Sequence, residues 1–157
     1  MLKRIIGQDT HDVAPSDQQW LNVDTLAQVE VTSEDTAHPI ESGLLPGMES
    51  GWRAAQSGAQ TVRLVFDQPQ RIKRLHLEFH EDQLERTQQF VLRWSSNGGQ
   101  SYREIVRQQY NFSPPATTSE HEDYPVDLDG VTTIELNIVP DISGGPARAS
   151  LAQLRLA

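Results

Sequence analysis

The sequence predicts an all-β fold, an antiparallel sandwich, from three observations: alternating apolar residues, turn residues between them, and a one-domain length. A chain of 157 residues can bury the core of one domain. Apolar and polar residues alternate in six segments, and this period of two is typical of half-buried antiparallel strands. Turn residues separate several of these segments, as they do in β-sandwiches.

The six strands are predicted in chain order from this alternation. The first is Val29–Thr32, in which apolar residues alternate with polar ones. The second, Thr61–Phe66, and the third, Arg74–His80, each place three apolar side chains on one face. The last three follow the same pattern: Phe90–Ser95, Thr133–Ile138 and Leu151–Leu156.

Short and long connections are predicted to lie at opposite ends of the sandwich, because antiparallel neighbours reverse direction. Three connections are short and rich in turn residues: Asp67–Gln70, Asn97–Gln100 and Asp129–Gly130. Four are longer: Asp35–Gly51, Glu81–Gln88, Tyr110–Asp123 and Pro140–Arg148. Binding residues concentrate on long loops held by a rigid scaffold, so the long-loop end is the predicted binding end.

The N-terminus is predicted to be a leader, residues 1–28, followed by the sandwich domain, residues 29–157. Within the leader we predict at most a short helix around Ser16–Ala27, which Ser16 could cap with Gln19 three residues on.

The composition argues against several classes of protein. There are no cysteines, which removes disulfides and thiolate metal sites. The formal charge of −9 disfavours nucleic acid as a partner. The apolar run at the N-terminus is too short for a signal peptide, and no apolar stretch is long enough to span a membrane. We therefore expect a soluble, cytoplasmic protein with no membrane partner.

Three motifs carry a family resemblance. They are Gly51-Trp52-Arg53, the pair of segments Gln60–Asp67 and Pro69–Ile72, and the hairpin Phe90–Tyr102. Their order, within about Val29 to Leu156, resembles the factor V/VIII type C or discoidin-like (galactose-binding-like) domain. That resemblance implies a jelly-roll β-sandwich that acts as a non-catalytic binding module. Its ligand would be a carbohydrate or another small polar molecule at the long-loop end. The alternative is an intracellular protein–protein interaction domain, because this fold serves both purposes.

The resemblance also raises the question of a structural calcium ion. The acidic residue that the family places before its Gly-Trp segment is not clearly present in Leu45–Ser50, although Glu49 could serve. The last strand has no Glu in Ala149–Leu154, where sugar-binding members often carry one. We therefore predict no cofactor, and calcium is not favoured.

The candidate ligand-binding residues combine aromatic faces with planar polar groups, which together suit sugar recognition. They are Arg53, Arg86, Gln88, Tyr110, Asn111 and Phe112. A structural interpretation stands beside this one. Phe112 could anchor a loop to the sandwich. Trp52 could be a core residue. Arg86 and Arg107 could pair with the acidic run Glu120, Glu122 and Asp123.

Catalytic and metal chemistry find little support in the sequence. His76, Glu78 and His80 would share one face of a strand, but the outer two would lie about 13 Å apart at about 3.3 Å per residue. His121 falls in a predicted acidic loop with no evident partner. There is no phosphate-binding loop and no nucleophile elbow. The prediction is that the protein is not an enzyme and holds no metal.

Overall fold

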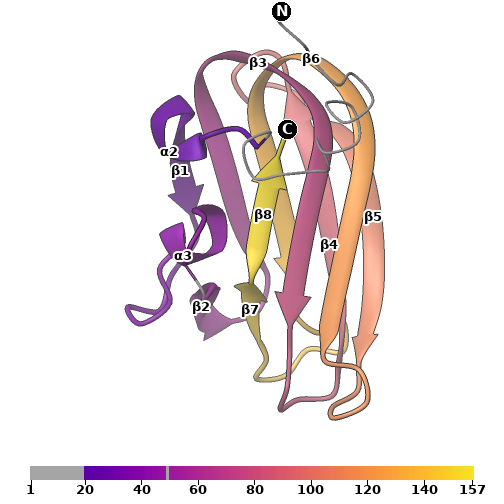
Figure 1. The fold of residues 1–157 in the computed structure, drawn as a ribbon. Coiled ribbons are helices and arrows are strands. Elements are labelled where there is room, and N and C mark those ends of the chain that lie inside the picture. The colour runs from indigo at the N-terminus through magenta and orange to yellow at the C-terminus, as the bar shows by residue number, and fades with distance from the viewer. Residues whose placement is uncertain (1–19, 49) are drawn as a thin grey trace, which may run out of the picture.

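The computed structural model describes residues 20–48 and 50–157, and these form an antiparallel β-sandwich (Figure 1). In these ranges the helices are two single turns, α2 (Val23–Leu26) and α3 (Glu41–Leu44). The strands are β1 (Ala27–Val31), β2 (Trp52–Ser57), β3 (Gln60–His80), β4 (Arg86–Ser95), β5 (Arg103–Phe112), β6 (Ser119–Val139), β7 (Arg148–Leu151) and β8 (Gln153–Leu156). The prediction of an all-β antiparallel jelly-roll sandwich is confirmed.

A long ladder between β3 and β6 forms the backbone of the fold. The two strands pair from Gln60 opposite Ile138 to His80 opposite Ser119. The register shifts near Asp67–Gln70 and Asp129–Gly130, where both strands arch over one end of the molecule (Figure 1). We predicted turns between separate strands at these two places. They are instead bends inside continuous strands, because bulges let a ladder curve without breaking it.

The bend divides the ladder between the two layers of the sandwich. One layer has the order β1-β3-β6-β4-β5 and uses the first half of β3 with the second half of β6. In the other layer, the second half of β3 pairs with β8 on one side and with the first half of β6 on the other. Phe79 and Phe90 meet across the core with ring centroids 5.3 Å apart. Both are fully buried, so the contact joins the two layers.

Most of the connections collect at two ends, as predicted. The β4–β5 hairpin and the two bends lie at the top of Figure 1. Residues 81–85, 113–118 and 140–147 connect strands at the bottom, and α3 lies beside β2. Two of these loops are shorter than predicted. The segment taken as a Tyr110–Asp123 loop is mostly strand, because β5 continues to Phe112 and β6 starts at Ser119.

The N-terminal residues that the structure describes pack against the sandwich. The Leu21 N–H donates to the Leu156 carbonyl over 2.7 Å, and β1 begins at Ala27, two residues earlier than predicted. Ser16, the predicted helix cap, lies outside the described residues, and α2 follows Asn22 instead. Within the described ranges no helix has the length and apolar character needed to cross a membrane.

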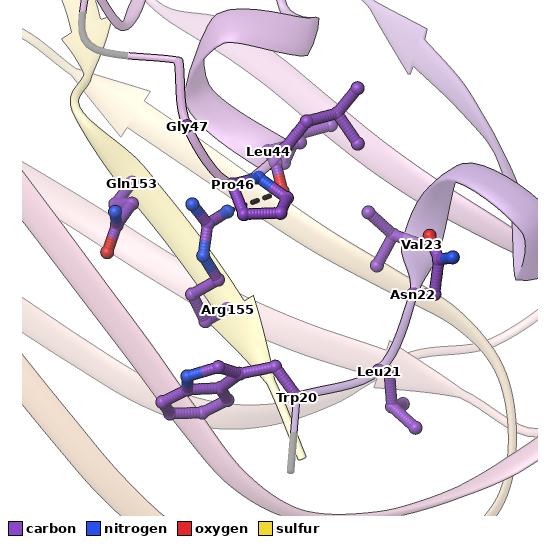
Figure 2. A pocket seen from close by; sticks show the side chains of 10 residues that line it. Trp20, Leu21, Asn22, Val23, Leu44, Pro46, Gly47, Gln153 and Arg155 are labelled. Atoms are coloured by element: carbon purple, nitrogen blue, oxygen red, sulfur yellow. Dashed lines mark hydrogen bonds between the residues drawn. The ribbon is translucent and has the colours of Figure 1, made fainter. Parts of the chain in front are cut away.

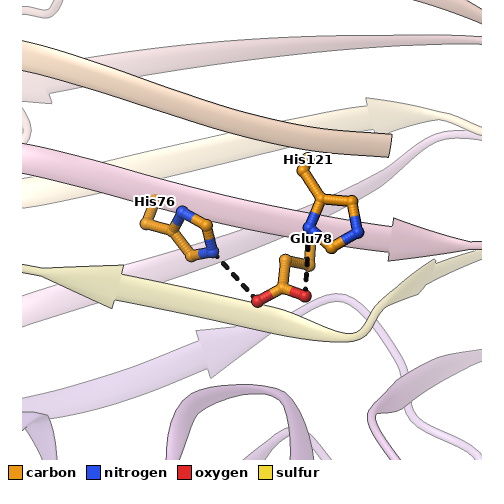
Figure 3. A group of neighbouring side chains, drawn as sticks. All are labelled: His76, Glu78 and His121. Carbon is orange, nitrogen blue, oxygen red and sulfur yellow. Dashed lines mark hydrogen bonds and ion pairs between the residues drawn. The ribbon is translucent and has the colours of Figure 1, made fainter. Parts of the chain in front are cut away.

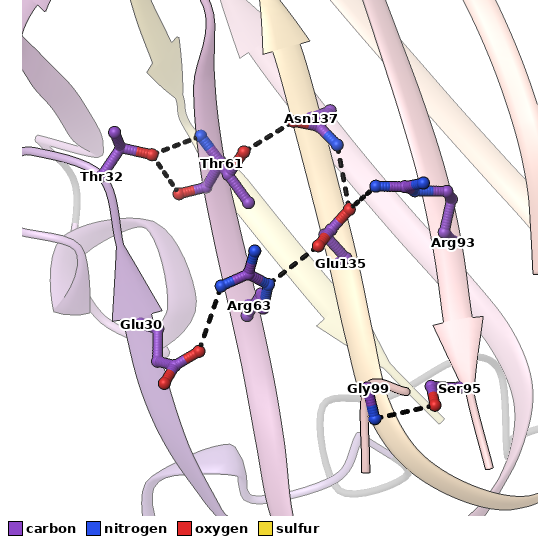
Figure 4. Close-up of polar contacts among 9 residues, drawn as sticks. All are labelled: Glu30, Thr32, Thr61, Arg63, Arg93, Ser95, Gly99, Glu135 and Asn137. Atoms are coloured by element: carbon purple, nitrogen blue, oxygen red, sulfur yellow. Dashed lines mark hydrogen bonds and ion pairs between the residues drawn. The ribbon is translucent and has the colours of Figure 1, made fainter. Parts of the chain in front are cut away.

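The outer face of the five-stranded layer is held by polar pairs between strands (Figure 4). Glu135 on β6 is only 2% exposed, yet it pairs with Arg63 on β3 over 2.8 Å and with Arg93 on β4. Burial alone would raise the pKa of Glu135, but the hydrogen bonds from the two arginines outweigh it and lower that pKa. These ion pairs therefore link three neighbouring strands, β3, β6 and β4, and stabilise the sheet.

Candidate ligand-binding site

Arg86 is a buried hub beneath the long-loop end. Its side chain is 1% exposed, and its Nε lies 2.7 Å from Glu81 Oε1. Its Nη1 donates to the Pro140 carbonyl over 2.8 Å, and its guanidinium stacks 4.7 Å from the centre of the Phe112 ring. Arg86 thus ties together the segments that lead into three loops. With 1% of its side chain exposed, Arg86 offers little surface for direct contact with a ligand.

Gln88 and Glu120 extend this interior network. Gln88 is fully buried and donates to Glu120 Oε1 over 3.1 Å. Burial, assisted by the charge of Glu122, raises the pKa of Glu120 to about 7. The predicted pairing of Arg86 with the acidic run was wrong, because the ion-pair partner of Arg86 is Glu81, five residues before it. Arg107 instead pairs with Glu104 over 2.9 Å on the exposed side of β5.

The predicted aromatic platform is absent at this end, among the residues described. Phe112 is fully buried and packs edge-on against Tyr110, with centroids 5.0 Å apart. The Tyr110 hydroxyl donates to the Ser119 carbonyl, and Asn111 accepts from the Thr87 hydroxyl over 2.7 Å. Arg86, Asn111 and Phe112 line a broad depression of about 790 Å³. Thr87 and Asn111 pair with each other there, and Arg86 is held by Glu81 and Pro140, although its Nη2 has no hydrogen-bond partner among the described residues.

Arg53 lies apart from the other predicted residues, in a narrower groove of about 180 Å³. We call it the loop-end groove, and its lining comprises His38, Ser50–Arg53, His80–Leu84, Arg148 and Ser150–Ala152. The structure therefore separates the predicted set, with Arg53 in this groove and Arg86, Asn111 and Phe112 around the depression.

The β2–β7 ribbon positions the cations of the groove. Arg53 is opposite Ser150, and Arg148, two residues back on β7, is opposite Ser57 across a register shift. Arg148 and Ser150 share a face of β7, and both arginines line the groove. That face is exposed, whereas Trp52 and Leu151 point into the core. The Trp52 Nε1 donates to the Ser33 carbonyl over 3.0 Å, which confirms the core role predicted for it.

Arg53 and Arg148 differ from most arginines of the chain in their lack of side-chain partners. Neither guanidinium has a hydrogen bond or ion pair with any residue that the structure describes. Nearby, the His38 Nδ1 lies 3.3 Å from the Ser50 carbonyl, which orients its ring. Leu84, which is 42% exposed, adds apolar surface to the groove. Two planar forks beside an apolar patch can hold paired hydroxyls or a carboxylate.

Arg148 and His38 are groove residues that the sequence reasoning missed. The alternation of Arg148-Ala149-Ser150-Leu151 marks a short strand with Arg148 outward. What places Arg148 beside Arg53 is the pairing of β2 with β7, which short segments do not specify. Glu49, considered as a calcium ligand, lies outside the described residues.

A larger hollow of about 320 Å³ lies elsewhere, between residues 20–23, residues 44–47 and β8 (Figure 2). Arg155 closes one side and donates to the Leu44 carbonyl. Its lining includes Trp20 and Gly47, close in sequence to residues that the structure does not describe. We therefore assign it no ligand.

Comparison with known proteins identifies the fold. No family model and no curated protein matches the sequence. Among solved structures, the family 32 carbohydrate-binding module of NanJ from C. perfringens, in complex with galactose, superposes with a TM-score of 0.60 at 12% identity. That match covers 83% of this chain and 92% of the other.

Two further structures show the same likeness. The family 32 module of AlyQ, in complex with 4,5-unsaturated mannuronic acid, gives a TM-score of 0.62 at 14% identity over 84% of this chain and 95% of the other. A pectin-binding carbohydrate-binding module gives 0.59 at 15% identity over 84% and 90%. The protein therefore has the discoidin-like, galactose-binding-like fold that its motifs predicted.

Proposed function

We propose that this protein is a non-catalytic carbohydrate-binding module whose ligand occupies the loop-end groove. The observation that carries the proposal is the pair Arg53 and Arg148. Both are exposed on the β2–β7 ribbon and line the loop-end groove, and no described residue pairs with either side chain.

The chemistry of these arginines supports a polar, oxygen-rich ligand. A guanidinium presents its donors in a rigid fork, which matches the spacing of vicinal hydroxyls or of a carboxylate. An arginine left without an acid at the surface keeps this capacity for a ligand. The ring of His38 adds a further polar group to the same groove.

The comparisons support this choice of ligand class. The superposed structures include modules in complex with galactose and with 4,5-unsaturated mannuronic acid, and one described as pectin-binding. Another of the matching chains joins such a module to an alginate lyase domain, and the match covers 31% of that chain. The resemblance is to the binding module, which supports a binding role rather than catalysis.

A glycan screen followed by titration tests the proposal. The full chain is screened against galactose, N-acetylgalactosamine and uronic acid oligosaccharides, and the best ligand is titrated calorimetrically into Arg53→Ala and Arg148→Ala. Loss of a charged hydrogen bond should weaken binding about tenfold or more in each variant. Arg71→Ala is the matched control, because Arg71 is exposed and pairs with Asp127 at the opposite end. Equal affinity in all four proteins would overturn the assignment.

A protein partner is the second candidate, favoured by two exposed apolar side chains at the same end. Leu84 is 42% exposed and Ile142 is 49% exposed, and they lie on the loops at 81–85 and 140–147. Exposed apolar residues on adjoining loops are typical of protein contacts. If the screen finds no sugar, and a stoichiometric partner binds the wild type but not Leu84→Asp, this second function replaces the first.

A further inference from the structure

A cluster of potential metal ligands lies on the outer face of the layer that contains β8, and none of its three side chains lines the loop-end groove. On the second half of β3, Leu75 and Leu77 face the core and are fully buried, so His76 and Glu78 face outward. The sequence raised His80 as the third ligand and rejected it on distance. His80 indeed lies elsewhere: it lines the loop-end groove, 3.8 Å from Asp82.

The third ligand comes from the neighbouring strand. His121 is the register partner of Glu78 in the β3–β6 ladder. We expected His121 to lie in a loop without a partner, and this was wrong because β6 begins at Ser119. The His76 Nε2 is 2.9 Å from Glu78 Oε2, and the His121 Nδ1 is 3.2 Å from Glu78 Oε1 (Figure 3). One carboxylate thus stands between two imidazoles.

The three side chains are close enough to share one ion. One ligand atom from each lies within 4.8 Å of the others. Zinc binds histidine nitrogen and carboxylate oxygen at about 2.0–2.2 Å in a tetrahedron, which places ligand atoms about 3.3–3.5 Å apart. Small side-chain rotations bring the cluster to that geometry without moving the strands. We propose that His76, Glu78 and His121 form a binding site for a divalent transition-metal ion, for which zinc is the best fit.

A second set of groups is arranged to support these ligands. The His76 Nδ1 is buried without a hydrogen-bond partner and lies 3.8 Å from Asp123 Oδ2. A small rotation of the ring lets Nδ1–H donate to that carboxylate, which leaves the Nε2 lone pair for the metal. Carboxylates placed behind ligating histidines in this way are a regular feature of zinc sites. Asp123 is itself fixed by Arg74, whose Nε donates to it over 2.8 Å.

Glu78 is supported in the same manner by β8. With its amide nitrogen facing Glu78, Gln153 donates to Glu78 Oε2 over 2.8 Å and its oxygen accepts from Arg155. The two nearby cations are already engaged, Arg74 with Asp123 and Arg155 with the Leu44 carbonyl. His121 is 61% exposed, which leaves the ion an approach from solvent and a coordination position for water.

The test is a calorimetric titration of zinc chloride into the tag-free, metal-stripped full chain in a non-chelating buffer. The expected result is one zinc per chain, with affinity reduced at least about tenfold in His121→Ala and in Glu78→Gln. His80→Ala is the matched control, because His80 is a β3 histidine outside the cluster, and it should bind as the wild type does. Both test variants should fold, since His121 is exposed and glutamine retains the shape of Glu78.

Two further readouts separate a metal site from a simple ion-pair cluster. Bound zinc should raise the melting temperature of the wild type but not of His121→Ala. Cobalt(II) should show the visible spectrum of a tetrahedral nitrogen–oxygen site in the wild type alone. Absence of zinc binding, or binding that survives both substitutions, would overturn the proposal, whatever the outcome for carbohydrate.

Discussion

Arg86 holds Glu81 across the short loop between β3 and β4, with 2.7 Å between Nε and Oε1. Burial alone would raise the pKa of Glu81, but hydrogen bonds from Arg86 and from the N–H groups of Gln83 and Leu84 outweigh it and lower that pKa. Leu84 and Glu81 both line the loop-end groove, so the Arg86–Glu81 pair shapes one wall of the proposed binding site.

Replacing Arg86 should therefore cost much of the stability of the loop end. Arg86→Ala leaves Glu81 Oε1 and the Pro140 carbonyl without the donor that Arg86 supplies and should lower the free energy of unfolding by about 3–5 kcal/mol. Urea denaturation measures this. Arg107→Ala is the control, because its exposed pair with Glu104 should contribute at most about 1 kcal/mol. Similar losses in the two variants would contradict the hub role of Arg86.

Glu120 should make the free energy of unfolding depend on pH between the ordinary pKa of a glutamate and its own raised pKa. Its folded pKa is about 7 against 4.5 for an ordinary Glu, so the buried group stays neutral while the unfolded chain ionises. The stability it contributes is complete below about pH 4.5 and is lost as pH rises towards 7. This loss amounts to at most about 3 kcal/mol.

Glu120→Gln removes that titration. Relative to the wild type, the variant should gain stability steadily from pH 4.5 to 7, measured by urea unfolding at several pH values. Glu81 and Glu135 have lowered pKa values and act the other way. The stability that they contribute to the fold is lost only as the pH falls below the ordinary pKa of a glutamate. Parallel curves for the two proteins would show that Glu120 is not buried as described.

Gly51 should tolerate no side chain, because it combines a left-handed conformation with close contact. Its φ is 68°, and an added Cβ would lie 2.9 Å from the Leu151 carbonyl oxygen. Gly51→Ala should destabilise the chain by about 2–4 kcal/mol and displace the β2–β7 ribbon. Gly58→Ala is the control, since Gly58 has φ 92° but open space around it. It should cost only the backbone strain, about 1–2 kcal/mol. An equal effect at both positions would mean that the contact with Leu151 is unimportant.

The alternation of apolar residues was sufficient to predict the sandwich and the six segments that face its core, because it reports which side chains are buried. It did not predict β2 or β5, whose apolar residues alternate less regularly. It was not sufficient to predict that the segments flanking Asp67–Gln70 form one strand, since a bend and a turn use the same residues. The lengths of the connections also predicted that Arg53 lies at the long-loop end. Burial of Arg86, Gln88 and Phe112 depends on how three loops close over them, which local patterns do not encode.

The same limit applies to pairs of residues that meet only across strands. His121 and Glu78 are 43 positions apart and become neighbours through the β3–β6 register. Arg53 and Arg148 come to line one groove through a ribbon of two short strands. Each pair consists of ordinary polar residues in the sequence, and only the pairing gives them a shared site.

The most direct test of the central claim is the position of bound sugar on the molecule. Nuclear magnetic resonance of the labelled chain during titration with the best glycan should shift the Nε–H signals of Arg53 and Arg148 and the amide of Ser150. The amides of Gly98 and Gly130, at the opposite end, should stay unchanged. Shifts confined to residues 113–117 and 141–143, or to the Gly98 end, would contradict binding in the loop-end groove.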